Sequence, residues 1–200
     1  MGTSDIRNPV QKRSIETKER IIKAGFDLIC KKGYYNTNTA EIAKAANVST
    51  GIVYQYFKDK HDILIESIQR YGTSVVLPMM EILENDFASD NLKVVLKRII
   101  NTLIQSHNIS RSAHNEIMAL SLADEQVAKI FQDSEMELTD KLIEILTKNG
   151  FKFDNMREKV HIIINLVDNL CHEVAYHKHE NMDYEVMIES VVDCVISLLK

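Results

Sequence analysis

Residues 39–62 read TAEIAKAANVSTGIVYQYFKDKHD, and this stretch decides the fold of the N-terminal part of the chain. Asn38 precedes it and Glu41 follows three positions later, which is the spacing of a capping box at a helix start. Asn47 suits a helix exit because Asn tolerates the left-handed conformation, and Ser49 can cap the next helix. The pattern predicts two short helices joined by a tight turn, with a third helix directly after them.

The second of these short helices has an apolar side and a polar side. Its predicted outer face carries hydroxyl and amide groups, from Thr50, Gln55 and Tyr56. Such groups hydrogen-bond DNA phosphates and base edges in the major groove. A packed helical hairpin with a polar outer face is the alternative that the spacing alone leaves open.

Residues 17–64 resemble the N-terminal domain of the tetracycline-repressor (TetR) family of bacterial regulators. The matching segments are KERIIKAGFDLICKKGYY, EIAKAANVSTGIVYQYF and KDKHDIL. Gly25, Cys30 and His61 depart from the Ala, aromatic and Glu that are usual in the family. The resemblance covers about a quarter of the chain.

This resemblance implies a repressor that leaves a palindromic operator when a small molecule binds its helical body. Thr50 and Gln55 are the positions expected to read bases, and Lys60→Ala is expected to weaken binding to all sequences. The DNA-binding positions carried over are Asn38, Thr39, Ser49, Thr50, Gly51, Tyr54, Gln55, Tyr56 and Lys60.

Charge is divided unevenly along the chain, whose net charge is −5. Residues 1–60 hold 11 Lys and Arg against 6 Asp and Glu, whereas residues 61–200 hold 13 against 23. A basic head attracts DNA while an acidic body is repelled from it. We therefore expect an all-α protein of about nine helices, with a helix-turn-helix DNA-binding domain at 1–60 and an effector-binding and dimerisation domain at 61–200.

Other functional classes find little support in the composition. Hydrophobic residues make up 45% of the chain without a long apolar run, and no signal-peptide pattern is present. The three cysteines are scattered, which is typical of a reduced, cytoplasmic protein. The chain has no Gly-rich phosphate loop, G-x-S-x-G or H-E-x-x-H, so we expect no enzyme, and no cofactor or metal ligand is assigned.

The body is predicted to be helical throughout. Gly72 and Pro78 predict a kink or break in the first body helix, since Pro removes a backbone donor. From 184 to 199 the polar residues recur every four positions and nearly all others are apolar. Because this apolar sector is wider than one core requires, we expect a homodimer on the last two helices, with Val191 and Val195 in the interface.

The helix predicted over 156–177 has an unusual polar face. Its members are His161, Asn165, Asp168, Asn169, His172 and Tyr176. Three interpretations stay open: a dimer interface or ordinary exposed face, the polar wall of an effector pocket, or a metal site that uses Asp168 and His172.

Candidate effector-binding residues lie on the middle helices and on this polar face, with ordinary core packing as the alternative for the Met and aromatic members. They are Tyr71, Met79, Met80, Phe87, His107, Met118, Phe131, Asn165, His172 and Tyr176. With few basic residues nearby, the expected effector is mostly apolar and neutral or cationic rather than a phosphorylated anion. A DNA-binding regulator without a small-molecule effector, controlled by a partner or acting as an activator, is the alternative function.

Overall fold

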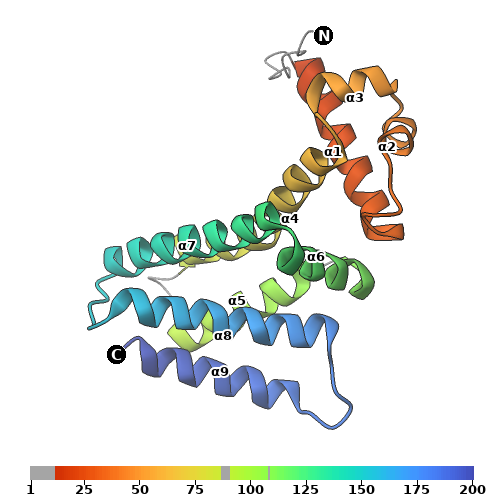
Figure 1. Ribbon diagram of the computed structural model, residues 1–200. Helices are drawn as coiled ribbons and strands as arrows, with labels where there is room; N and C mark the ends of the chain where they lie inside the picture. Colours follow the sequence, from red (N-terminus) through yellow and green to blue (C-terminus); the bar gives the residue numbers. More distant parts are fainter. Residues whose placement is uncertain (1–11, 87–90, 108) are drawn as a thin grey trace. The chain divides into compact units, whose positions relative to one another are not determined.

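Most of the described residues of the protein are helical (Figure 1). The structure, a computed structural model, describes residues 12–86, 91–107 and 109–200. Its helices are α1 (Lys12–Lys32), α2 (Thr39–Ala45), α3 (Thr50–Tyr56), α4 (Lys60–Asp86), α5 (Leu92–Ser106), α6 (Arg111–Ala123), α7 (Glu125–Lys148), α8 (Met156–Tyr176) and α9 (Tyr184–Leu198). These residues include no strand, so the expected all-α class is confirmed.

The chain divides into two compact units. The head unit comprises the described residues up to Gly72 together with Ile109–Ile130, and the body unit comprises those of 73–107 together with Phe131–Lys200. The boundaries of these units therefore differ from the predicted functional division at residue 60. The start of α4, all of α6 and the start of α7 belong to the head unit because they share its core.

The turn between α2 and α3 has the predicted local structure. Asn38 Oδ1 accepts from the Glu41 backbone at 3.0 Å, and the Glu41 carboxylate accepts from the Asn38 backbone at 3.2 Å. Asn47 has a φ of 54°, and Ser49 Oγ accepts from the Ile52 backbone at 3.3 Å. The helix-turn-helix expected from the sequence is thus confirmed.

Two apolar clusters hold the head unit together, and α1 contributes to both. The first joins α1 to α2, α3 and the start of α4 through Ile21, Ile22, Ile42, Ala43, Ala46, Val53, Tyr56, Phe57 and Ile63. The second joins α1 and α4 to α6 and α7 through Ile29, Leu64, Ile68, Ile117, Leu120 and Val127. The second cluster explains why α6 belongs to the head unit.

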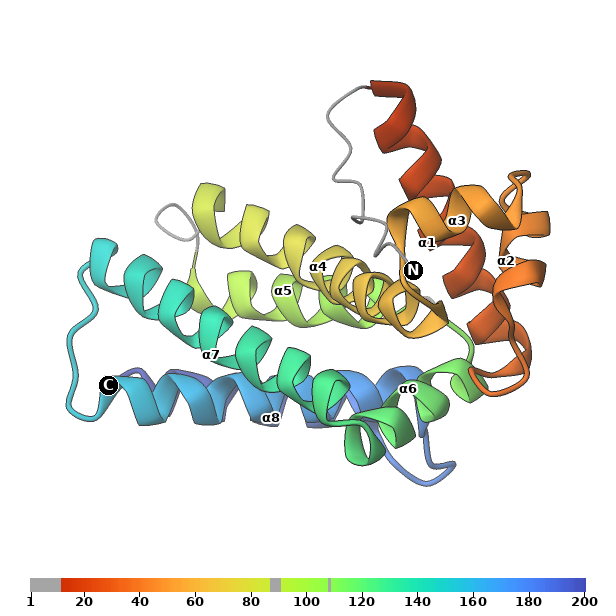
Figure 2. The ribbon, with the colours of Figure 1, turned by 45° about the horizontal axis from the view of Figure 1, so that its top comes forward.

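The body unit is a bundle of helices. In it α5 packs against α8 and α9, which pack against each other, and Figure 1 shows α8 and α9 side by side. Figure 2 shows the second half of α4 running beside α5. The helix α4 continues through Pro78, so the break that the sequence allowed is absent. Among the described residues, none of the helices has the length and apolar composition needed to cross a membrane.

Gly25 in α1 is expected to be a packing requirement of the head unit. A Cβ atom at this position would lie 2.5 Å from Ile63 Cγ2, a methyl group on a stiff β-branched side chain. Overpacking of this kind costs about 1–3 kcal/mol, which outweighs the roughly 1 kcal/mol that Ala gains in helix propensity. Gly25→Ala should therefore lower the free energy of unfolding, measured by urea denaturation followed by circular dichroism.

Gly72 provides the matched control within α4. Nothing lies within 4 Å of a Cβ atom built there. Gly72→Ala should consequently raise the free energy of unfolding by roughly 0.5–1 kcal/mol. Equal stabilisation by both substitutions would show that the contact with Ile63 does not constrain the head.

Candidate DNA-binding surface and body cavity

A polar groove lies on the head unit, between the start of α1 and the helices α2 and α3. Its basic side chains are Arg13 and Arg20 from α1 and Lys44 from α2, and all three are exposed. The other lining residues are Ser14, Thr17, Asn47, Val48, Ser49, Ile52, Gln55 and Tyr56. Guanidinium, ammonium, hydroxyl and amide groups are the donors that proteins use on DNA phosphates. Sequence reasoning overlooked Lys44, although a basic residue in the last turn of α2 was visible.

Four of the predicted DNA-binding positions lie on the exposed face of α3. Thr50, Gly51, Tyr54 and Gln55 are all exposed. Thr39 is half-buried at the start of α2. Exposure is a requirement for contact with DNA, and these contacts stay a prediction.

Tyr56 does not lie on the outer face of α3, and this placement from the sequence was wrong. Only 6% of the residue is exposed, and its hydroxyl group lies 2.7 Å from Ser14 Oγ in α1. Val53, Tyr56 and Phe57 have the i, i+3, i+4 spacing of one helix face, so they are buried together. The side chain of Tyr56 therefore fastens α3 to α1 at the edge of the groove.

Lys60 has partners within the head unit. Its Nζ atom donates to the carbonyl oxygens of Tyr34 at 2.8 Å and Thr37 at 2.9 Å. The same atom lies 4.2 Å from the centroid of the Tyr34 ring. The ammonium group thus holds the α1–α2 loop closed, a structural role beside the predicted contact with DNA.

The same loop is also held by α6. The Glu116 carboxylate accepts a hydrogen bond from the Tyr34 backbone and lies against Gly33, which has a φ of +91°. A Cβ atom at Gly33 would lie 2.7 Å from Glu116 Oε2. Glycine is required there by both the backbone conformation and this close approach.

A second polar link joins the start of α4 to the start of α7. His61 Nε2 lies 2.8 Å from Asp124 Oδ2. The Val127 backbone N–H and the His61 side chain lower the pKa of the Asp124 carboxyl. His61 was recognisable in the sequence as a departure from the family's usual Glu, but its partner was not.

The body unit contains a cavity of about 120 Å³ surrounded by α4, α5, α7, α8 and α9. All its lining side chains are apolar except His107 and Asp168, with Cys171 counted among the apolar ones. Burial raises the pKa of the Cys171 thiol to about 12, so this group is neutral. The wall is formed by Met79, Leu83, Leu96, Ile99, Leu103, His107, Leu138, Leu142, Ile145, Leu146, Val160, Ile163, Ile164, Val167, Asp168, Cys171, Val195 and Leu199.

Only part of the predicted effector set reaches this cavity. Met79 and His107 line it. Met80 lines a neighbouring depression together with Lys141 and Lys148, and Phe131 is 37% exposed. The structure does not describe Phe87.

Two further members of the predicted set lie in the head unit rather than the body. Tyr71 stacks on Phe26 of α1 with ring centroids 5.5 Å apart. Met118 is exposed on α6. Their assignment to the body cavity was wrong, because Met and aromatic residues mark apolar helix faces without showing which core those faces join.

The polar face of α8 divides into two groups with different neighbours. Towards its start, Asn165 Nδ2 donates to Glu135 at 2.5 Å, and His161 Nδ1 lies 3.2 Å from Thr139 Oγ1. Both partners belong to α7. This part of the face therefore packs within the same chain and lies outside the cavity lining.

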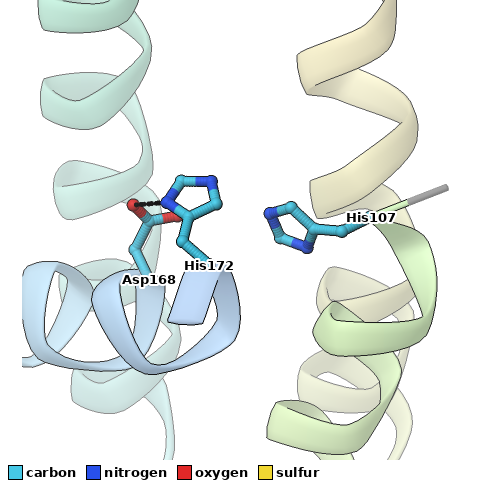
Figure 3. Close-up of side chains that lie close together, drawn as sticks. All are labelled: His107, Asp168 and His172. Atoms are coloured by element: carbon cyan, nitrogen blue, oxygen red, sulfur yellow. Dashed lines mark ion pairs between the residues drawn. The ribbon is translucent and has the colours of Figure 1, made fainter. Parts of the chain in front are cut away.

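The second group meets the end of α5. His172 Nδ1 lies 3.2 Å from Asp168 Oδ2, and the His107 and His172 ring centroids are 4.8 Å apart (Figure 3). Tyr176 is buried beside them, with its centroid 5.8 Å from that of His107. Burial and the nearby His172 lower the pKa of His107. His172 and Tyr176 thus approach the polar end of the cavity without lining it.

Val195 does not lie on the surface of α9, contrary to its assignment to a dimer interface. It is 1% exposed and lines the cavity of its own chain, whereas Val191 is half-buried. Two acidic residues of α9 face α5, where Lys93 Nζ lies 3.1 Å from Glu189 and 2.9 Å from Asp193. Pairing of this polar stripe with α5 turns Val195 inward.

Comparison with known proteins places these features in a family. Residues 21–66 match the sequence model described as "Bacterial regulatory proteins, tetR family". The chain belongs to the TetR family. The matched segment runs from α1 to the start of α4 and contains the helix-turn-helix.

Curated TetR-family relatives match parts or most of the chain. The fatty acid metabolism regulator protein of Bacillus subtilis is 30% identical over 128 residues, which cover 64% of this chain and 59% of that protein. The uncharacterized HTH-type transcriptional regulator YerO of the same organism is 26% identical over 194 residues, covering 92% and 65%. The alignments thus span less than two thirds of these relatives' own lengths.

Solved TetR-family structures confirm the fold over nearly the whole chain. A candidate TetR-family transcriptional regulator from Mesorhizobium loti superposes with a TM-score of 0.73 at 18% identity, covering 94% of this chain and 97% of that one. The fatty acid degradation regulator FadR from Bacillus halodurans gives a TM-score of 0.62 at 22% identity, covering 90% and 94%.

Substitutions in the groove and on the exposed face of α3 should affect DNA binding in two different ways. Lys44→Ala should weaken binding to every duplex and reduce the slope of log affinity against log salt by about 0.9, because one phosphate contact is lost. Gln55→Ala should instead reduce discrimination between a selected site and unrelated DNA by roughly 1–3 kcal/mol. Fluorescence anisotropy at several salt concentrations, on a site selected from random duplexes, measures both effects.

Lys148→Ala is the matched control for the loss of one positive charge. This lysine lies on the body and pairs with Glu144 at 2.8 Å. The variant should leave the salt slope unchanged. If the Lys44→Ala slope and the Gln55→Ala specificity both equal those of the wild type, the assigned surface is wrong.

Proposed function

We propose that this protein is a transcriptional regulator that binds a palindromic operator as a homodimer and releases it when an apolar small molecule enters the body cavity. The match of residues 21–66 to the TetR family and the basic groove beside α3 support DNA binding. Such a regulator works in the cytoplasm, where the DNA is.

The apolar cavity is the observation that carries the ligand-responsive part of the proposal. Its wall offers aliphatic contacts with one polar end, which suits a molecule with a hydrocarbon chain and a single polar group. One relative at 30% identity is named a fatty acid metabolism regulator protein, and a molecule with a hydrocarbon chain fits the apolar wall of this cavity. The cavity also favours this function over a regulator that lacks a small-molecule effector.

The size of the cavity suggests how binding is coupled to DNA release. A volume of about 120 Å³ is close to that of an engineered cavity that holds benzene, at ~150 Å³. A longer chain therefore needs its wall helices to move apart. Two of those helices, α4 and α7, continue into the head unit. An effector that prefers the expanded body shifts the population towards head arrangements with lower operator affinity.

The proposed dimer uses the exposed surfaces of α8 and α9. Val186 is 59% exposed and Ile162 is 52% exposed, which is unusual for large aliphatic residues on otherwise well-packed helices. Ser190 and Cys194 follow Val186 at four-residue intervals and are exposed. Small residues in such a row let a partner helix approach closely, and burial in a second copy removes the apolar groups from water.

Alkyl compounds of equal chain length should test the cavity. Decanol, decylamine and decanoate are suitable probes, and binding should raise the midpoint of thermal unfolding in a dose-dependent way. Val167→Phe should abolish this shift, because the larger ring fills the cavity. Val94→Phe is the matched control, since Val94 is 55% exposed on α5 and lies outside the lining.

The same probes should lower operator affinity for the wild type and for Val94→Phe, but not for Val167→Phe. A shift that is equal in both variants would place the ligand elsewhere. Stabilisation by nucleotides or sugar phosphates alone would overturn the proposed apolar class.

Charge substitution should test the dimer. Val186→Glu is expected to give a folded monomer at micromolar concentration in sedimentation experiments, because a carboxylate is costly to bury in an interface. Val94→Glu should stay dimeric. A compact wild-type monomer under the same conditions would refute the assembly.

A further inference from the structure

Three potential metal ligands from two helices meet at the polar end of the cavity. His107 follows the last residue of α5, whereas Asp168 and His172 lie four residues apart on α8. One ligand atom from each lies within 4.8 Å of the others. Figure 3 shows a ring nitrogen of His107 pointing towards the α8 pair.

The orientation of His107 is the one that metal-binding histidines adopt. Its Nδ1 atom donates to the Leu103 carbonyl oxygen at 2.7 Å. This hydrogen bond fixes the tautomer and leaves the lone pair on Nε2. Metal ligands of this type characteristically use their second ring nitrogen in such a bond.

The α8 pair supplies the other two donors from one helix face. Residues four apart lie one above the other on a helix, so Asp168 and His172 can contact one ion together. His172 Nδ1 and Asp168 Oδ2 are already 3.2 Å apart. Two imidazoles with one carboxylate form a ligand set for first-row transition metals, whereas Mg²⁺ and Ca²⁺ prefer oxygen ligands.

We propose that His107, Asp168 and His172 form a binding site for a divalent transition-metal ion such as Zn²⁺. With Zn–N and Zn–O bonds of about 2.0–2.2 Å, the donor atoms need to close from within 4.8 Å to roughly 3.3 Å of one another. Rotation of the three side chains provides this movement. Three protein ligands leave the fourth coordination position of the metal open. The proposal does not depend on the identity of an effector or an operator.

Zn²⁺ titration of the full-length, chelator-treated protein by isothermal calorimetry tests the site. One ion is expected to bind each chain. His107→Ala, His172→Ala and Asp168→Asn should each reduce the affinity by about 100-fold or more, since each removes a ligand or its charge. Co²⁺ provides a second readout, because its visible absorption should report nitrogen and oxygen ligands in the wild type and diminish in the variants.

His179→Ala is the matched control, because this histidine is exposed beyond the end of α8. It should bind Zn²⁺ like the wild type. Circular dichroism checks that all variants remain folded. Absence of saturable binding by the wild type, or equal affinity in the wild type and His107→Ala, would overturn the proposal, and neither result bears on DNA binding or on alkyl ligands.

Discussion

Burial of two different faces of α1 is the constraint on which the head unit depends. One cluster fixes α2 and α3 on this helix, and the other fixes α6 and the start of α7 on it. The close approach of Ile63 to Gly25 belongs to the same packing. The surface assigned to DNA is therefore part of a larger core than the three helices that define the family match. Its geometry depends on residues more than 50 positions away in the sequence.

The body unit differs from the head unit because its apolar interior is not completely filled. Protein interiors are normally filled to the density of organic crystals, so an apolar void forfeits contacts that its lining could have made. The side chains that line the void are apolar, apart from His107 and Asp168 at one end. A molecule that fills this space recovers the lost contacts, and the polar end gives it a direction. Loose packing in the body is thus compatible with tight packing in the head.

Local signals predicted the head well, whereas contacts between distant residues could not be predicted. The capping box at Asn38 and the left-handed Asn47 depend on neighbours within a few positions, and the structure has both. Tyr56 was placed on an outer surface because of its hydroxyl group, and Val195 because its helix is apolar on several sides. Only the packed neighbours show which side of each helix is buried. The cavity is lined by ordinary Leu, Ile and Val residues, which no sequence pattern distinguishes from solid core.

The contact between Glu116 and the loop at Gly33 and Tyr34 has a consequence for exchanging parts between related regulators. The loop leads directly into α2, yet one of its anchors comes from α6. A chimera made by transplanting only the segment that matches the family model would lack Glu116. A residue of the recipient protein would then take the place of this carboxylate beside Gly33. A complete head unit therefore includes the second segment, Ile109–Ile130, as well. Hybrid regulators with redirected DNA specificity should therefore carry α6 with the head.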